Sequence, residues 1–253
     1  MLQNDTILIT GGGSGIGEAF ALLLANDNRV IICGRNETKL KKVSSKNKNI
    51  SYEVADISDQ NSIDKLFISL KEKKIVLNVL FNNAGVVELW EVINGKLTTR
   101  EIFEKVNTNL SGAIAVTQHF ISQADHSAEN MIVNNTSEIA LMPVPIMPIY
   151  SATKGGLSVF TRTLRVQLQH TKFRVVELLT PSVDTDMPKQ LNNNGKLLNT
   201  SDFVRSAIKN IKKGKLTYAP GPNVFLLKLF GRVAPVMGLK IIDKLSRKQL
   251  GVK

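Results

Sequence analysis

The chain has 253 residues, 43% of them hydrophobic and 21% charged, which fits one large soluble α/β domain. Half of its net charge of +12 lies in the last 30 residues, but without a zinc-finger or RNA-binding motif this charge indicates no nucleic-acid partner. The single cysteine, Cys33, excludes an internal disulfide, is compatible with a reducing compartment and favours a cytoplasmic location.

The sequence shows no signal for export or for a membrane span. The first apolar run has no basic start and no small-residue cleavage site, and no window of about 18 residues is both apolar and uncharged. The three histidines have no metal-ligand spacing with one another or with Cys33, so no metal site is expected.

The chain begins with a predicted strand over Thr6–Thr10, a glycine-rich segment over Gly11–Gly17 and a helical pattern over Glu18–Ala25. This order places backbone N–H groups and a helix N-terminus where a pyrophosphate can bind. Glycine is needed there because a side chain would hold the phosphates away from the backbone. The Gly-x-x-x-Gly-x-Gly spacing differs from the commoner Gly-x-Gly-x-x-Gly of dinucleotide sites.

The second predicted strand, Val30–Cys33, ends in Gly34-Arg35. In dinucleotide-binding sheets an acidic residue about 20 positions past the glycines bonds the ribose of NAD, whereas an arginine accommodates the 2′-phosphate of NADP. Gly34 occupies the acidic position here and Arg35 follows it. The sequence therefore favours NADP(H) over NAD(H), with Arg35 as a plain loop cation as the alternative.

The later segments continue the alternation of strands and helices. Strands are predicted over Ser51–Val54, Val79–Phe81, Met131–Asn135, Arg174–Leu179 and Leu216–Ala219, and helices over Ser62–Lys71, Thr99–Phe120 and Tyr150–His170. The pattern predicts a doubly wound Rossmann-type parallel sheet of about seven strands with helices on both faces, as a single domain over residues 1–222. Residues 184–203 are expected to form a mobile substrate loop.

Tyr150 and Lys154 are four residues apart and would share one face of the predicted helix. A cation beside a phenol favours the phenolate, so Lys154 is expected to lower the pKa of Tyr150 toward neutral pH. Such a pair suits general acid-base catalysis. A solvated Tyr and Lys pair is the alternative.

Five elements occur in a set order and spacing: Thr10-Gly11-x-x-x-Gly15-Ile16-Gly17, Asn82-Asn-Ala-Gly85, Asn109-Leu-Ser-Gly112, Ser137 and Tyr150-x-x-x-Lys154. Together they resemble the short-chain dehydrogenase/reductase family over about residues 5–220. Within that family, Ile32–Arg35 and Thr180–Thr185 look most similar to the oxidoreductases encoded with D-alanine-transfer genes of low-GC bacteria. The family's usual Pro-Gly after the sixth strand is Pro181-Ser182 here, which puts the local backbone geometry in doubt.

The resemblance implies an NADP(H)-dependent oxidoreductase that interconverts a carbonyl and an alcohol by hydride transfer. Tyr150 would be the acid/base, Lys154 would hold the ribose, Ser137 would bind the substrate oxygen, and Asn109 would hold a water in a proton relay. The other implied cofactor contacts are Gly11, Ser14, Gly15, Ile16, Gly17, Arg35, Asp56, Ile57, Asn83, Ala84, Gly85, Pro181, Val183 and Thr185. Taken one at a time, Ser137, Asn109 and Asp56 have structural or capping alternatives. The rival function is a catalytically silent NADP-binding sensor or scaffold.

The apolar loop Leu141–Met147 predicts a small hydrophobic carbonyl or alcohol substrate. The alternative is that its apolar residues only pack under the substrate loop. The family resemblance implies a homodimer or homotetramer through the helices predicted over Thr99–Phe120 and Tyr150–His170.

Residues 223–253 form a basic extension that the resemblance does not cover. Apolar residues recur there at intervals of three or four, as Leu226, Phe230, Val233, Met237, Ile241 and Leu245. Pro235 is expected to divide the segment into two helices. Docking of this apolar stripe on the chain's own domain is the favoured interpretation. The alternatives are a cover over the substrate entrance, a second subunit and a peripheral contact with an anionic membrane.

Overall fold

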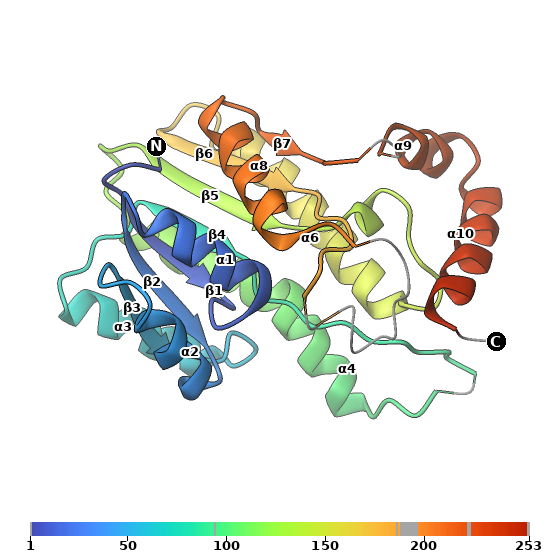
Figure 1. Ribbon diagram of the computed structural model, residues 1–253, viewed down its shortest axis with the longest axis horizontal. Coiled ribbons are helices and arrows are strands. Elements are labelled where there is room, and N and C mark those ends of the chain that lie inside the picture. The colour runs from blue at the N-terminus through green and yellow to red at the C-terminus, as the bar shows by residue number, and fades with distance from the viewer. Residues whose placement is uncertain (1, 94, 186, 188–196, 222–223, 252–253) are drawn as a thin grey trace.

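A computed structural model describes residues 2–93, 95–185, 187, 197–221 and 224–251 (Figure 1). Its centre is one parallel sheet with the strand order β3-β2-β1-β4-β5-β6-β7. The strands are β1 (Thr6–Thr10), β2 (Arg29–Gly34), β3 (Ile50–Val54), β4 (Val79–Asn82), β5 (Asn130–Asn135), β6 (Phe173–Leu178) and β7 (Thr217–Tyr218). The predicted doubly wound sheet is confirmed, and its strand order reverses between β1 and β4, where such sheets bind their ligands.

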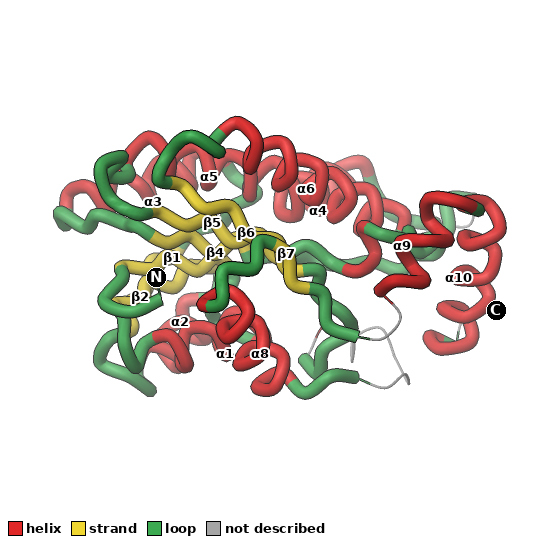
Figure 2. The backbone as a smooth tube through the Cα atoms, turned by 90° about the horizontal axis from the view of Figure 1, so that it is seen from above, coloured by secondary structure: helices red, strands yellow, loops and turns green. Residues whose placement is uncertain are grey.

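Helices cover both faces of the sheet, as Figure 2 shows from above. They are α1 (Gly15–Leu24), α2 (Glu37–Ser44), α3 (Gln60–Glu72), α4 (Thr99–Val106), α5 (Gly112–Gln123), α6 (Pro148–Gln167), α8 (Thr200–Lys212), α9 (Val224–Val233) and α10 (Pro235–Leu250). Helices α1, α2 and α8 lie on one face, and α3, α5 and α6 lie on the other. Helices α2 and α8 were not predicted from the sequence. The segment predicted as one long helix consists of α4, a π-helical turn over Asn107–Ser111, and α5.

The two helical layers create two apolar cores. Side chains alternate along a strand, so Ile7 and Ile9 of β1 enter the core under α1 and α8, while Leu8 enters the core under α3 and α5. Because both faces are covered, the central strands are apolar throughout rather than alternating with polar residues. This burial fixes the carboxyl ends of the strands along one edge, where the candidate site residues follow them.

The basic extension forms two helices with Pro235 at the first position of the second, as predicted. The favoured interpretation of the apolar stripe is wrong, because its six residues are 36–72% exposed. Two glycines face the domain instead. A Cβ atom at Gly231 would lie 2.3 Å from the carbonyl oxygen of Leu141, and one at Gly238 would lie 2.4 Å from Cε of Met142. This close backbone approach turns the stripe outward.

Candidate active site

A cleft of about 580 Å³ opens at the carboxyl edge of the sheet. Most of the expected site residues line it, namely Gly11, Ser14, Gly15, Ile16, Arg35, Asp56, Ile57, Asn83, Ala84, Gly85, Ser137, Tyr150, Lys154, Pro181, Val183 and Thr185. Gly17 and Asn109 stand behind this lining, where they support Gly11 and Val86 respectively. Of the expected substrate loop, residues 186 and 188–196 lie outside the described residues.

The glycine segment forms a tight cradle at the start of α1. Gly11 and Gly15 have φ angles of 67° and 57°, which L side chains rarely adopt. A Cβ atom at Gly17 would lie 2.3 Å from the carbonyl oxygen of Gly11, so only glycine allows this turn. Ser14 makes no side-chain cap to α1, which leaves the first-turn N–H groups directed toward an anion. These features fit the pyrophosphate of a dinucleotide.

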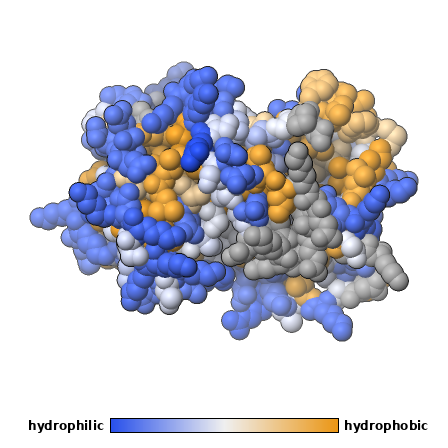
Figure 3. All heavy atoms as spheres, in the orientation of Figure 1, coloured by the Kyte–Doolittle hydropathy of each residue, from blue (hydrophilic) through white to orange (hydrophobic). Residues whose placement is uncertain are grey.

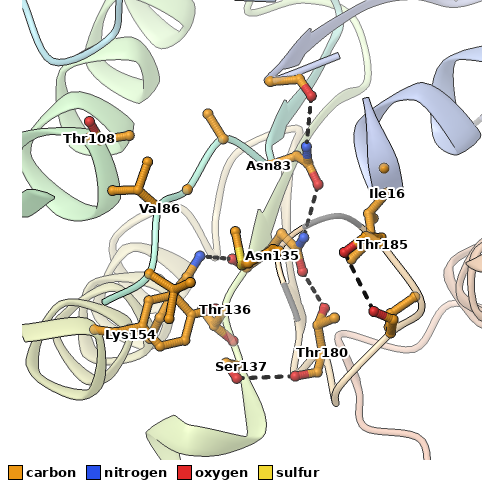
Figure 4. Close-up of a pocket in the computed structure, with 18 of the residues that line it drawn as sticks. Ile16, Asn83, Val86, Thr108, Asn135, Thr136, Ser137, Lys154, Thr180 and Thr185 are labelled. Atoms are coloured by element: carbon orange, nitrogen blue, oxygen red, sulfur yellow. Dashed lines mark hydrogen bonds between the residues drawn. The ribbon is translucent and has the colours of Figure 1, made fainter. Parts of the chain in front are cut away.

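Asn135, at the end of β5, ties four segments of the site together (Figure 4). Its Nδ2 donates to Oδ1 of Asn83 at 3.0 Å, and its Oδ1 accepts from the hydroxyl of Thr180. Its backbone oxygen accepts a 2.7 Å hydrogen bond from Nζ of Lys154. This role was not predicted from the sequence, because an asparagine at a strand end has no distinctive spacing.

Ser137, Tyr150 and Lys154 meet at the bottom of the cleft. The Nζ of Lys154 lies 5.7 Å from the centre of the Tyr150 ring, and Ser137 lines the same cleft. Ser137 also donates to the backbone oxygen of Thr180 at 3.1 Å and accepts from the N–H of Ile139, so the expected strand-end cap is present as well.

Burial controls the protonation of this group. It raises the pKa of Tyr150 to about 12, against a smaller lowering by the Ser137 side chain, and it lowers the pKa of Lys154 to about 8. The expected lowering of the Tyr150 pKa by Lys154 is therefore not found. The reason is that Lys154 is itself only 3% exposed and directs its ammonium to the oxygen of Asn135.

Asn109 lies in the π-helical turn, a feature frequent at functional sites. Its side-chain amide accepts from the N–H of Val86 and donates to the oxygen of Val86, both at 2.8 Å, and also donates to Thr153. A Cβ atom at Gly85 would lie 3.4 Å from Oδ1 of Asn109 and 3.5 Å from Nζ of Lys154. Asn109 thus clamps the strand-end loop beside Lys154, and its role in a proton relay stays a prediction.

Comparison with known proteins decides the family of this chain. The sequence pattern described as short chain dehydrogenase matches residues 5–196. The chain belongs to the short-chain dehydrogenase family. It is 33% identical to the uncharacterized oxidoreductase DltE of Bacillus subtilis over 85% of this chain and 87% of that protein. It is 27% identical to human 17-beta-hydroxysteroid dehydrogenase type 3, over 82% of this chain and 68% of the relative.

A solved member of the short-chain dehydrogenase family has the same architecture. It is the 3-ketoacyl-(acyl-carrier-protein) reductase of Brucella melitensis complexed with NADH, with a TM-score of 0.74 and 26% identity. The similarity covers 83% of this chain and 91% of the reductase. Among the described residues no helix is long and apolar enough to cross a membrane, and no group of three or more His, Cys, Asp or Glu could hold a metal ion.

Two glutamates of this short-chain dehydrogenase were not predicted from the sequence. Glu88 is 5% exposed, and its Oε1 accepts a 2.9 Å hydrogen bond from the backbone N–H of Tyr150. Glu138 follows Ser137 and lines the cleft, where burial raises its pKa to about 7. Neither residue belongs to a recognisable motif, because its place in the site follows from the fold and not from a residue spacing in the sequence.

Proposed function

We propose that the protein is an NADP(H)-dependent oxidoreductase that interconverts a carbonyl and an alcohol by hydride transfer. The observation that carries this proposal is the meeting of Ser137, Tyr150 and Lys154 in one cleft with the glycine cradle. The nicotinamide cofactor supplies the hydride, and the protein supplies position and a proton.

Three side chains divide the chemistry at the substrate oxygen. With a pKa of about 12, Tyr150 is protonated at neutral pH and so can donate a proton to a carbonyl oxygen during reduction. The Ser137 hydroxyl, which donates to the backbone oxygen of Thr180 in this structure, would turn to donate to the same substrate oxygen and orient it. Lys154, fixed by the backbone oxygen of Asn135, provides donors toward the cofactor ribose.

The preference for NADP(H) rests on the cations at the end of β2. Arg35 lines the cleft and is exposed, and Lys39, one turn into α2, lines it as well. Asn36 caps α2 through the N–H of Lys39 at 2.9 Å, which fixes the turn between the two cations. No carboxylate occupies positions 34 to 36 to repel a 2′-phosphate.

The substrate is proposed to be a hydrophobic carbonyl or alcohol. Apolar side chains from the loop before α6 and from the tail line the same cleft, namely Ile139, Met142, Val144, Met147, Leu227, Ile242 and Leu250. The names of two relatives, a hydroxysteroid dehydrogenase and a ketoacyl reductase, are consistent with a largely apolar substrate.

Tyr150→Phe is the decisive test, because it removes the phenolic oxygen and keeps the ring. We expect turnover of a panel of hydrophobic ketones to fall by a factor on the order of 10² or more, with the melting temperature retained. Tyr218→Phe is the matched control, since Tyr218 bonds to Ser206 away from the lining of the cleft. If Tyr150→Phe keeps full turnover, the mechanism is wrong.

A silent sensor or scaffold remains the rival function. Such a protein would change the fluorescence of NADPH in a binding titration. It would not oxidise NADPH when any carbonyl compound is added. Lys154 favours the enzyme, because holding a lysine at 3% exposure is costly without a chemical role.

We further propose a cytoplasmic homodimer or homotetramer. Exposed apolar residues on the two helices expected at the interface support it: Phe103 on α4 is 62% exposed, and Val159 and Val166 on α6 are 53% and 62% exposed. Val159→Asp with Val166→Asp should reduce the mass found by analytical ultracentrifugation. An unchanged mass would exclude this face as the interface.

A further inference from the structure

The two tail helices carry an apolar surface that faces away from the domain (Figure 3). We name it the outer tail surface, and it consists of Phe225, Leu226, Leu229, Phe230, Val233, Val236, Met237, Ile241 and Leu245. Each of these side chains is 36–72% exposed, and together they make up half of the large exposed hydrophobic residues in the described chain. A monomeric soluble protein rarely leaves such a cluster without a partner.

Cations share this surface on α10. At about 100° per residue, one half of the helix presents Val236, Met237, Lys240, Ile241, Lys244, Leu245, Arg247 and Lys248. The three lysines are exposed and lie between the apolar side chains rather than on an opposite face. On α9 the exposed apolar residues form one arc, and Lys228 and Arg232 flank its edge.

The opposite sides of both helices are fixed to the domain. Gly231 and Gly238 pack closely against Leu141 and Met142, and Leu250 is 6% exposed. Arg247, at the edge of the outer half near Val236, also reaches Glu91 of the domain through a 2.5 Å ion pair. The outer tail surface is therefore presented by a docked element, and the inner residues Leu227 and Ile242 line the catalytic cleft behind it.

We propose that the outer tail surface lies in the headgroup region of an anionic lipid membrane. Phenylalanine and aliphatic side chains enter the boundary of the acyl chains, while lysines and arginine contact lipid phosphates. A second copy of the chain fits less well. A symmetric pair would bring the same five exposed cations from each copy face to face, and protein interfaces are depleted in lysine.

Vesicle co-sedimentation of the full chain tests this inference. At low salt we expect binding to phosphatidylglycerol–phosphatidylcholine vesicles, little binding to pure phosphatidylcholine vesicles, and release of the protein as salt rises. Lys240→Gln with Lys244→Gln should weaken binding roughly 25-fold, since each cation near the surface contributes about a fivefold effect. Phe225→Ser with Leu229→Ser should also weaken it.

The matched control is Lys209→Gln with Lys212→Gln, which removes two exposed cations from α8 and should leave binding unchanged. The proposal is overturned if the full chain stays in the supernatant with anionic vesicles at low salt, or if the control pair weakens binding equally. It is also overturned if Phe225→Ser with Leu229→Ser dissociates an oligomer in ultracentrifugation and leaves vesicle binding intact. Binding is measured without turnover, so its failure and that of the proposed oxidoreductase activity are separate results.

Discussion

The carboxylate of Glu88 holds the first turn of the helix that carries Tyr150. Oε1 of Glu88 accepts the backbone N–H of Tyr150 at 2.9 Å, and Met147, the residue before α6, offers no side-chain cap. Glu88, 62 residues earlier in the chain than Tyr150, therefore takes the place of a local N-terminal cap. Its charge also raises the pKa of Tyr150, after the larger effect of burial.

Substitution of Glu88 separates these two effects. Glu88→Gln keeps an acceptor and removes the charge, so the pKa of Tyr150 should fall, and the rise of kcat/KM for alcohol oxidation with pH should begin at lower pH. Glu88→Ala should also cost about 1–3 kcal/mol in the free energy of unfolding, because buried N–H groups lose their acceptor. Glu129→Gln, on the surface, is the control, and an equal shift in that variant would contradict the assignment.

The lowered pKa of Lys154 should make the folded protein more stable at alkaline pH. Its pKa is about 8 in the folded protein and 10.5 in a free lysine, so between these values the unfolded chain holds more protons. The free energy of unfolding should therefore rise with pH over this window, by up to about 3 kcal/mol. Above pH 10 the raised pKa of Tyr150 works in the opposite direction. Urea unfolding at pH 7.5 and pH 10 should show the rise in the natural chain but not in Lys154→Met.

Protonation of Glu138 should make the activity depend on pH near neutrality. Burial raises its pKa to about 7, and it lines the cleft next to Ser137. A pH profile of kcat/KM is expected to show an inflection near 7 that disappears in Glu138→Gln. A profile that keeps this inflection in the variant would assign it to another group.

Arg35→Asp should weaken NADPH binding strongly and leave NADH binding little changed. Only NADPH has a 2′-phosphate, whose charge-assisted contact is lost and replaced by repulsion. Dissociation constants from nicotinamide fluorescence measure both. Lys42→Asp, exposed on α2, provides a control for general charge effects. An equal loss for the two cofactors would show that Arg35 does not bind the phosphate.

Two helical glycines should respond in opposite ways to alanine. A Cβ atom at Gly112 would lie 2.0 Å from the carbonyl oxygen of Ile57, whereas one at Gly155 would meet nothing within 4 Å. Gly112→Ala should therefore destabilise the fold by about 1–3 kcal/mol through overpacking, and Gly155→Ala should be neutral or stabilise it by up to about 1 kcal/mol. Thermal unfolding of both variants checks this contrast.

The sequence predicted the elements whose signals are local. Each buried strand is an apolar run, and the glycine cradle and the Tyr150 to Lys154 spacing are short motifs. Helix α8 had a readable signal, with Asn199 as its cap and Phe203, Ala207 and Ile211 four residues apart on its buried face. Helix α2 is short and mostly polar, so periodicity does not distinguish it from a loop.

Properties that depend on packing could not be predicted from the sequence. The direction of the Tyr150 pKa shift follows from burial, and burial follows from how α6 lies against the loop that carries Glu88. The orientation of the tail helices is decided by close contacts at Gly231 and Gly238. Hydrophobic spacing alone predicted that the apolar stripe packs on the domain, whereas it faces outward.

The π-helical turn over Asn107–Ser111 makes the site depend on chain length. Such a turn accommodates one residue more than a regular α-helix does over the same path. Deleting a single residue from it would let the helix become regular over the same path, so the side chains of the turn would change direction while α4 and α5 kept theirs. Asn109 would then leave Val86, and the loop after β4 would lose its clamp. A one-residue deletion here should therefore be far more damaging than most substitutions.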